Sequence, residues 1–166
     1  MTQIQYPEIE TERLLLKELT SKDAAGLFLL FSNPDVTRYM DIDPLQKESE
    51  ALEIIEFHFD DSGCRWGLYD RETSQLIGTC GYHLWRKDTH TAEIGYDLSP
   101  AYWGKGIMQE ALNAIIDFGF NTMDLRIIEA EVEPENKQSI RLLEKLNFHP
   151  DLSRDSGLDW FLLFKN

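Results

Sequence analysis

The chain has 166 residues, and 16 Lys and Arg stand against 30 Asp and Glu, which gives a net charge of −14 at pH 7. Such an acidic chain repels phosphate backbones and anionic lipid surfaces, so nucleic-acid and membrane partners are not expected. Apolar residues make up 42%, enough for a core, and the length fits one domain over residues 1–166. With no apolar run of membrane-spanning length and no basic leader, we expect a cytoplasmic protein.

The first third of the chain predicts one strand followed by two helices. A strand is expected at 13–19, and a helix from Asp23 to Phe31, which Asn33-Pro34 ends. A second helix is expected at about 46–59, because its apolar residues recur at helical spacing.

The middle of the chain changes to a period of two residues, which is typical of strands. Three such segments predict an antiparallel meander, at 64–70, 75–85 and 92–98. Gly78 and Gly81 are candidate bulge positions within the second strand.

The last third predicts alternating helices and strands. The expected elements are a helix at about 105–122, a strand at 126–132, a helix at 136–146 and a strand at 158–164. Together with the earlier elements they predict an α/β fold of the α+β kind, a mixed sheet with helices on both faces.

Gly104 and Gly106 lie where the strand at 92–98 turns into the long helix. Glycines let the backbone approach a ligand closely, and the first N–H groups of a helix lack partners within it. Such a helix start binds phosphate or diphosphate groups well. A tight turn that merely needs glycines is the alternative, and the Walker and dinucleotide motifs are both absent.

Three blocks, in the same order, resemble the GNAT N-acetyltransferases, and in particular the branch of the ribosomal-protein N-terminal (alanine) acetyltransferases. They are T-E-R-L-L-L at 11–16, A-E-I-G-Y-D-L-S-P-A-Y-W-G-K-G-I-M-Q-E-A-L at 92–112, and V-E-P-E-N-K-Q-S-I-R-L-L-E-K-L-N-F at 132–148. Two positions depart from the family pattern: Ala101 replaces a Gln or Arg at the start of the loop, and Asn147 replaces a Gly that ends a helix.

The resemblance implies a GNAT acyl-CoA N-acyltransferase fold, with a mostly antiparallel sheet that splays where acetyl-CoA binds. The diphosphate would bind the backbone amides of Trp103, Gly104, Lys105, Gly106 and Ile107. The pantetheine arm would lie along Tyr96, Asp97 and Leu98. Asn136 would contact this arm, and Ser139 would donate a proton or hydrogen bond to the departing thiolate. Whether the Lys105 side chain touches phosphate is left open.

Glu93 is the candidate base, because the attacking amine must lose a proton and a carboxylate beside the acetyl group can accept it. It is equally an ordinary surface carboxylate on a strand, with water acting as the base. Asn136 and Ser139 have structural alternatives as well, because both lie at a helix start and can satisfy its backbone there.

The resemblance implies acetyl transfer from acetyl-CoA directly to a primary amine, either a protein N-terminus or a small cationic amine. Polyamines, aminoglycosides and lysine side chains remain alternative acceptors, and a non-catalytic acyl-CoA-binding regulatory domain is the rival function. Cys64 and Cys80 have no metal-ligand or disulfide spacing, so we expect buried thiols and no metal site. The apolar strand at 160–164 suggests a homodimer through strand pairing.

Overall fold

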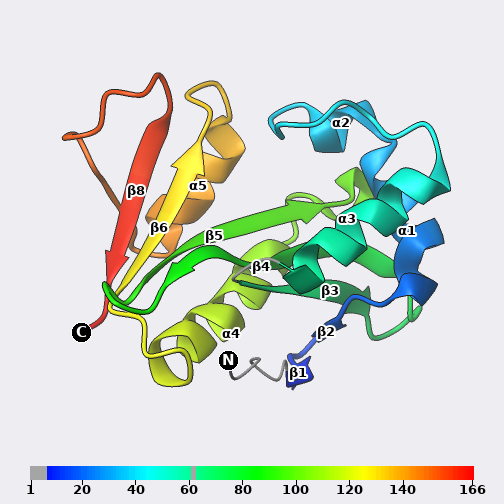
Figure 1. The fold of residues 1–166 in the computed structure, drawn as a ribbon, viewed down its shortest axis with the longest axis horizontal. Coiled ribbons are helices and arrows are strands. Elements are labelled where there is room, and N and C mark those ends of the chain that lie inside the picture. Colours follow the sequence, from blue (N-terminus) through cyan, green and yellow to red (C-terminus); the bar gives the residue numbers. More distant parts are fainter. Residues whose placement is uncertain (1–6, 61–62) are drawn as a thin grey trace.

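The period-two segments of the chain assemble into one sheet in the computed structural model, which describes residues 7–60 and 63–166 (Figure 1). Within these ranges the sheet has eight strands in the order β1-β2-β3-β4-β5-β6-β8-β7. The strands are β1 (Ile9–Glu10), β2 (Leu14–Glu18), β3 (Cys64–Asp70), β4 (Leu76–Arg86), β5 (Thr91–Leu98), β6 (Ile127–Val132), β7 (His149–Pro150) and β8 (Asp159–Phe164). Neighbouring strands are antiparallel except β5 and β6, which are parallel. The predicted meander and mixed sheet are confirmed.

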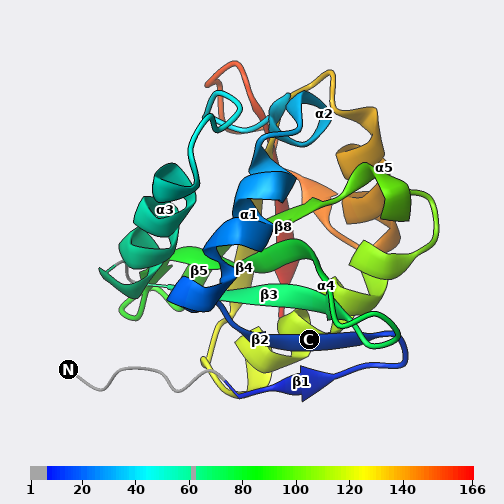
Figure 2. The ribbon, with the colours of Figure 1, turned by 90° about the vertical axis from the view of Figure 1, so that its right-hand side faces the viewer.

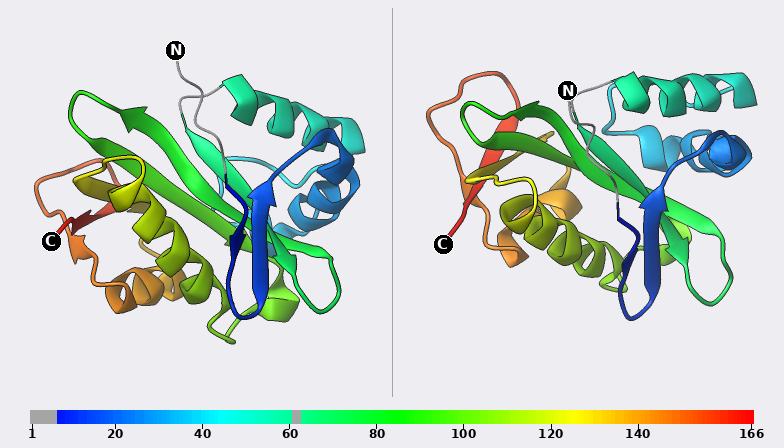
Figure 3. Two further views of the ribbon diagram at one scale, coloured as in Figure 1. Left: turned by 90° about the horizontal axis from the view of Figure 1, so that it is seen from below. Right: turned by 60° about the horizontal axis from the view of Figure 1, so that its bottom comes forward.

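Helices cover both faces of this sheet, as the sequence predicts. They are α1 (Ala24–Phe31), α2 (Pro34–Thr37), α3 (Glu48–Asp60), α4 (Ile107–Asn121) and α5 (Lys137–Lys145), with short 3-10 turns at Ser21–Asp23 and Pro100–Tyr102. Helices α1 and α3 lie on one face, while α4 and α5 lie on the other (Figures 2 and 3). No helix within the described ranges combines the length and apolar character needed to span a membrane.

Local signals explain where the helices begin. The Thr20 side chain and Asp23 form a capping box before α1, and Asn33 caps α2 with Pro34 in its first turn. The long helix was expected from residue 105 but begins at Ile107, because Gly106 is its N-cap with a φ of 75°. This left-handed conformation suits glycine and turns the chain sharply into α4.

Two apolar clusters hold the layers together. The larger lies between the sheet and helices α4 and α5, and includes Trp66, Leu112 and Leu143. The smaller joins α1, α2 and α3 to the other face, around Leu27 and Ile55. Trp66 is fully buried and meets Phe118 edge to face, with ring centroids 5.1 Å apart.

One detail of the predicted sheet is wrong. Gly81 is not a bulge, since it pairs in regular register with both neighbouring strands. It is needed there because a Cβ atom would lie 2.0 Å from the Cys64 carbonyl oxygen. The β3–β4 register shifts beside Gly78, between Leu68 and Tyr69, and a second shift on β4 lies between His83 and Arg86.

Candidate active site

The centre of the sheet contains an opening between β5 and β6. The two strands pair only at Thr91–Ile127, Ala92–Ile128 and Glu93–Glu129. Beyond Glu93, β5 stays on β4 as far as Leu98, whereas β6 stays on β8 as far as Val132. Figure 1 shows the two strands diverging from this point, with α5 beside β6. The expected splay is therefore present, and it leaves backbone groups of both strands facing a gap.

The loop that leads from β5 into α4 presents a row of backbone amides at one end of this opening. Gly104 and Gly106 have φ values of 73° and 75°, and a Cβ atom on Gly104 would meet no protein atom within 4 Å. Among the described residues, the amides of Gly104, Lys105, Gly106 and Ile107 donate to no protein acceptor. Together with the positive end of the α4 dipole, these groups suit an anion.

Trp103 differs from the rest of this predicted set. Its amide donates to the Pro100 carbonyl oxygen at 3.1 Å, and its indole Nε1 donates to the Leu98 carbonyl oxygen at 2.8 Å. Both contacts fix the end of β5 against the loop. The side chain of Lys105 is exposed, with its Nζ 5.7 Å from the centroid of the Tyr102 ring.

Tyr96 and Ser139 meet on the side of the opening that faces α4 and α5. The two hydroxyl groups share a short hydrogen bond between β5 and the first turn of α5. Burial raises the pKa of Tyr96 to about 12, although the Ser139 hydrogen bond lowers it. Tyr96 therefore keeps its proton at neutral pH, and the two linked hydroxyl groups lie next to the gap.

Asn136 is the N-cap of α5, and its Oδ1 accepts a hydrogen bond from the Ser139 amide at 3.3 Å. The structural alternative of a helix cap is thus realised. The contact of Asn136 with the cofactor arm remains a prediction. The NH2 group of the same side chain could donate the hydrogen bond that this contact needs.

Asp97 turns its side chain to the opposite face of the sheet. Its Oδ2 lies 2.8 Å from Arg65 Nη2 and accepts a hydrogen bond from Thr79 Oγ1 at 2.7 Å. Burial raises the pKa of Asp97, and the Arg65 charge counteracts part of this. The side chain of Leu98 is buried in the larger core. Only the backbone of these two predicted residues therefore faces the gap.

Carboxylates gather on the face that carries α1 and α3. Glu93 is buried at the last paired position of β5, with its Oε1 3.2 Å from His83 Nε2. Opposite it on β6, Glu129 accepts from Arg154 Nη2 at 2.8 Å and lies 3.6 Å from Arg86 Nη2. The predicted base therefore stands at the point where the sheet opens, on the face opposite the Tyr96–Ser139 pair.

Glu131 extends this acidic region along β6. Partial burial raises the pKa of its carboxyl group, and the nearby charges of Glu93, Glu133 and Asp41 raise it further, while His83 lowers it. The segment after α2 reaches the same region, because the Tyr39 hydroxyl donates to the Glu135 carbonyl oxygen at 3.4 Å. Carboxylates from three parts of the chain, Glu93, Glu131, Glu133 and Asp41, therefore lie near one another on this side of the gap.

The other candidates lie away from the opening or have structural roles. Cys64 and Cys80 are free and buried, and burial raises the pKa of Cys64 to about 12 and that of Cys80 still further, so neither suits a nucleophile. The Tyr82 hydroxyl donates to the Ile115 carbonyl oxygen in the core. In the described part of the chain, no three His, Cys, Asp or Glu side chains are grouped as metal ligands.

Sequence reasoning did not identify the partners of the candidate residues. His83, Glu129 and Glu131 come to Glu93 through the strand register, and Tyr96 comes to Ser139 across 43 residues. The alternation in 127–132 does place Glu129 and Glu131 on one face. The parallel pairing of that strand with β5 is what brings them to Glu93.

An anion-binding loop beside a gap of unpaired backbone fits a donor that joins a diphosphate to an extended, amide-containing arm. The family model described as "Acetyltransferase (GNAT) domain" matches residues 13–149. The chain belongs to the GNAT acetyltransferase family. It is therefore an acyltransferase whose donor is acetyl-CoA, and the predicted fold and family resemblance are confirmed.

Relatives of this GNAT domain include N-acetyltransferases with and without a named acceptor. An uncharacterized N-acetyltransferase, p20 of Bacillus licheniformis, is 43% identical over 150 residues, which cover 87% of this chain and 84% of that protein. The [ribosomal protein uS5]-alanine N-acetyltransferase of Escherichia coli is 34% identical over 99 residues, 59% of this chain and 51% of that protein. The fold of this chain matches that of spermidine N-acetyltransferase from Vibrio cholerae in complex with CoA and spermine, with a TM-score of 0.80. The two sequences are 21% identical, and the match covers 93% of this chain and 96% of that one.

Proposed function

We propose that this acetyltransferase moves the acetyl group of acetyl-CoA directly to the primary amine of a small cationic acceptor, within a ternary complex. The observation that carries the proposal is the position of Glu93. It is buried where β5 and β6 separate, on the opposite face of the sheet from Tyr96 and Ser139. A base on one side of the gap and a proton donor on the other suit a reaction in which the amine attacks from the first side and the CoA thiolate leaves on the second.

Acetyl-CoA would bind on the side of α4 and α5. The free amides from Gly104 to Ile107 would hold its diphosphate, and the backbone of β5 from Tyr96 to Leu98 would pair with its pantetheine arm. An N–H group of β5 between Ile94 and Tyr96 would polarise the thioester carbonyl group. Binding both substrates in this alignment supplies much of the rate.

Transfer then needs two proton movements. The acceptor nitrogen attacks the thioester carbon and loses a proton to Glu93, directly or through one water molecule. The C–N bond forms as the C–S bond breaks, and the Tyr96–Ser139 pair gives a proton to the departing sulfur. Both groups return to their starting states by exchange with water. Cys64 and Cys80 take no part, because no acyl-enzyme is needed.

The acidic surroundings of the gap favour a cationic acceptor over a neutral one. The charges of Glu93, Glu133 and Asp41 lie close enough to Glu131 to raise the pKa of its carboxyl group, and a positive ligand would relieve this repulsion. A polyamine brings an attacking amine and at least one further charge. Relatives with named acceptors act on spermidine or on a ribosomal-protein alanine, so a protein N-terminus is the competing acceptor to test.

The first experiment is thermal unfolding with acetyl-CoA, with NAD and ATP as controls, followed by a thiol-release assay with polyamines and with peptides of N-terminal alanine. We expect stabilisation by acetyl-CoA alone and turnover of polyamines. Turnover of the peptides but not of polyamines would overturn the cationic small-molecule acceptor.

The same assay tests Glu131. Its raised pKa means that the carboxylate loses its charge at a higher pH than an ordinary glutamate does as the pH falls. The KM for a cationic acceptor should therefore rise on acidification, and Glu131→Gln should raise it about threefold at neutral pH and flatten the pH dependence. Glu144→Gln, which removes an exposed charge from α5, is the matched control. Equal KM values for the two variants would contradict the role of Glu131.

The predicted homodimer also remains a proposal. β8 pairs with β6 on one side, and β7 covers its other side at Phe161 and Leu162, so a partner strand would have to pair elsewhere along that edge. Sedimentation equilibrium tests the oligomeric state.

A further inference from the structure

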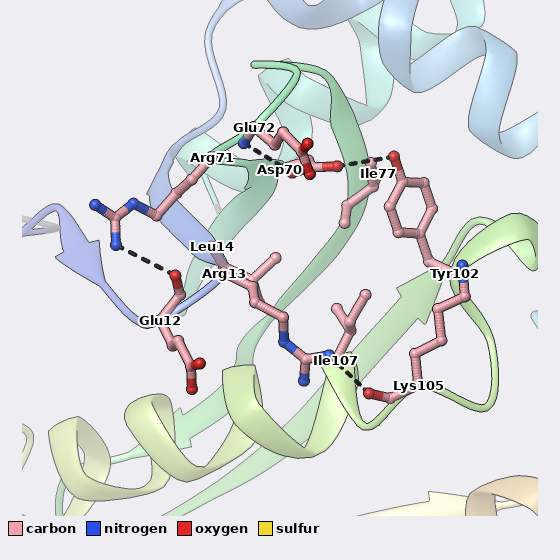
Figure 4. Close-up of a pocket in the computed structure, with 10 residues that line it drawn as sticks. All are labelled: Glu12, Arg13, Leu14, Asp70, Arg71, Glu72, Ile77, Tyr102, Lys105 and Ile107. Atoms are coloured by element: carbon pink, nitrogen blue, oxygen red, sulfur yellow. Dashed lines mark hydrogen bonds between the residues drawn. The ribbon is translucent and has the colours of Figure 1, made fainter.

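Thr11 and Arg13 contact the loop at 102–107 and the first turn of α4, which carry the amides proposed to bind the diphosphate. The reaction described above uses neither residue. A cavity of about 530 Å³ lies between the 102–107 loop, the β3–β4 turn and the segment leading into β2 (Figure 4). Three cations line it, Arg13, Arg71 and Lys105. Figure 4 shows that Arg13 reaches across to the loop, whereas Arg71 points toward Glu12.

Arg13 connects three parts of the site with a single side chain. Its Nη1 donates to the Lys105 carbonyl oxygen at 2.8 Å, and its Nε donates to Glu110 Oε1 at 2.8 Å. A Cβ atom on Gly106 would lie 3.6 Å from its Nη2, so the guanidinium packs against the loop itself. The planar, forked group suits this double contact, which a lysine could make only in part.

Glu110 is anchored from the same segment by further hydrogen bonds. Its Oε2 accepts from the Arg13 amide at 2.9 Å and from Thr11 Oγ1 at 2.5 Å, and its own amide donates to the Gly106 carbonyl oxygen at 3.1 Å. Burial alone raises the pKa of Glu110, but the hydrogen bonds from Thr11 and Arg13 outweigh it and leave the pKa lowered. Glu110 is therefore an ionised carboxylate in the first turn of α4.

A negative charge at this place opposes the binding of a diphosphate. The positive end of the α4 dipole attracts anions, and the Glu110 carboxylate offsets part of the positive potential that would attract a diphosphate. Arg13 neutralises that carboxylate through its Nε contact, and it leaves the amides of residues 104–107 without a protein partner in the described residues. The same contact fixes the peptide plane between Lys105 and Gly106, and with it the direction of one of the unpartnered amides.

We propose that Arg13 is a positioning residue for acetyl-CoA, which holds the amides of residues 104–107 in their binding arrangement and cancels the charge of Glu110. The inference rests on the proposed diphosphate site. It gives the T-E-R-L block at 11–14 a role in donor affinity, 92 residues away from the carbonyl group that Arg13 contacts.

The test compares Arg13→Gln with Arg71→Gln by calorimetric titration with CoA. Both variants remove one positive charge from the same cavity. However, the hydrogen bonds of the Arg71 guanidinium within the described residues go to the carbonyl oxygens of Thr11 and Glu12, at 2.8 and 3.3 Å, and not to the loop. Arg13→Gln should weaken CoA binding about tenfold, the loss of one charge-assisted hydrogen bond, and Arg71→Gln should weaken it less than twofold.

A second readout separates positioning from general damage. Acetyl-pantetheine lacks the diphosphate, so Arg13→Gln should lower kcat/KM for acetyl-CoA while leaving kcat/KM for acetyl-pantetheine within about twofold of the wild type. Arg13→Lys keeps the positive charge but loses the forked guanidinium, so its CoA affinity should be intermediate between those of the wild type and Arg13→Gln. Where Arg13→Gln does not fold, Arg13→Lys against Arg71→Lys makes the same comparison.

The outcomes are distinct. Wild-type CoA affinity in Arg13→Gln, an equal loss in Arg71→Gln, or an equal loss of rate with both donors would each overturn the inference while leaving the diphosphate site in place. A wild-type protein that does not bind CoA would instead refute the diphosphate site and the inference with it.

Discussion

Along β5, neighbouring residues face opposite sides of the sheet and meet opposite surroundings. Ile94 and Tyr96 pack with the apolar core under α4 and α5, while Glu93 and Asp97 are buried beside His83 and Arg65 on the other face. The two sides meet at the gap beside β6. One strand thus separates an apolar side, where the proposed donor would bind (the donor side), from a charged side, where the proposed acceptor would bind (the acceptor side).

The two sides differ in how they are stabilised. The donor side gains from the hydrophobic effect and tight packing, whereas the acceptor side buries ion pairs such as Arg65–Asp97, which add little net stability. Replacing both partners of such a pair would therefore cost the fold little, whereas removing one partner would leave a buried unpaired charge and cost about 3–5 kcal/mol.

The largest expected effect comes from damaging the donor side at the loop. Gly104→Val places a β-branched residue at a φ of 73°, which costs about 1–3 kcal/mol and forces the loop out of its conformation. Acetyl-CoA affinity measured by calorimetry should fall by more than about 100-fold.

Gly157→Val is the matched control for this change. Gly157 has a φ of 80° and equally open surroundings, but it lies in the β7–β8 loop. The two variants should lose similar stability in urea, and only Gly104→Val should lose acetyl-CoA. Full affinity in Gly104→Val would remove the loop from the donor site.

The next effect comes from the acceptor side of the gap. Glu93→Gln removes the proposed base and should lower kcat about 100-fold, with acetyl-CoA affinity unchanged. Glu129→Gln, at the paired position of β6, changes a carboxylate held by Arg154 and should leave most of kcat. A wild-type kcat in Glu93→Gln would mean that water alone deprotonates the amine.

A smaller effect is expected at the donor-side pair. Ser139→Ala and Tyr96→Phe each remove one of two linked hydroxyl groups, and because the other remains, kcat should fall about tenfold with little change in acetyl-CoA affinity. Tyr82→Phe removes a hydroxyl that is bonded in the core, so it should cost stability and leave kcat intact. Unchanged turnover in both site variants would assign the pair a structural role.

Alternating and helical periodicity was sufficient to predict the long elements. The strands 64–70 and 126–132 and the helices before and after them lie within a few residues of their expected bounds. The two-residue strands β1 and β7 and the single-turn helix α2 were missed, because no periodicity exists at that length and neighbouring segments induce them.

Some residues of the candidate site could likewise be predicted from local sequence patterns, and others could not. Gly104, Gly106, Glu93 and Ser139 could be named from motifs, since each lies in a block with a recognisable pattern. Arg13 could not, because its partners Lys105 and Glu110 lie 92 and 97 residues further along the chain. Contacts of that kind depend on how the layers pack, which no local pattern contains.

The opening in the sheet also bears on aggregation. Unpaired strand edges at the periphery of a sheet recruit other chains, and proteins protect themselves by keeping such edges short. In the described residues, both outer strands, β1 and β7, have only two residues, while the long unpaired edges of β5 and β6 face each other inside the sheet. The molecule can thus offer extended backbone to a small ligand from edges inside the sheet, apart from the peripheral edges at which other chains add.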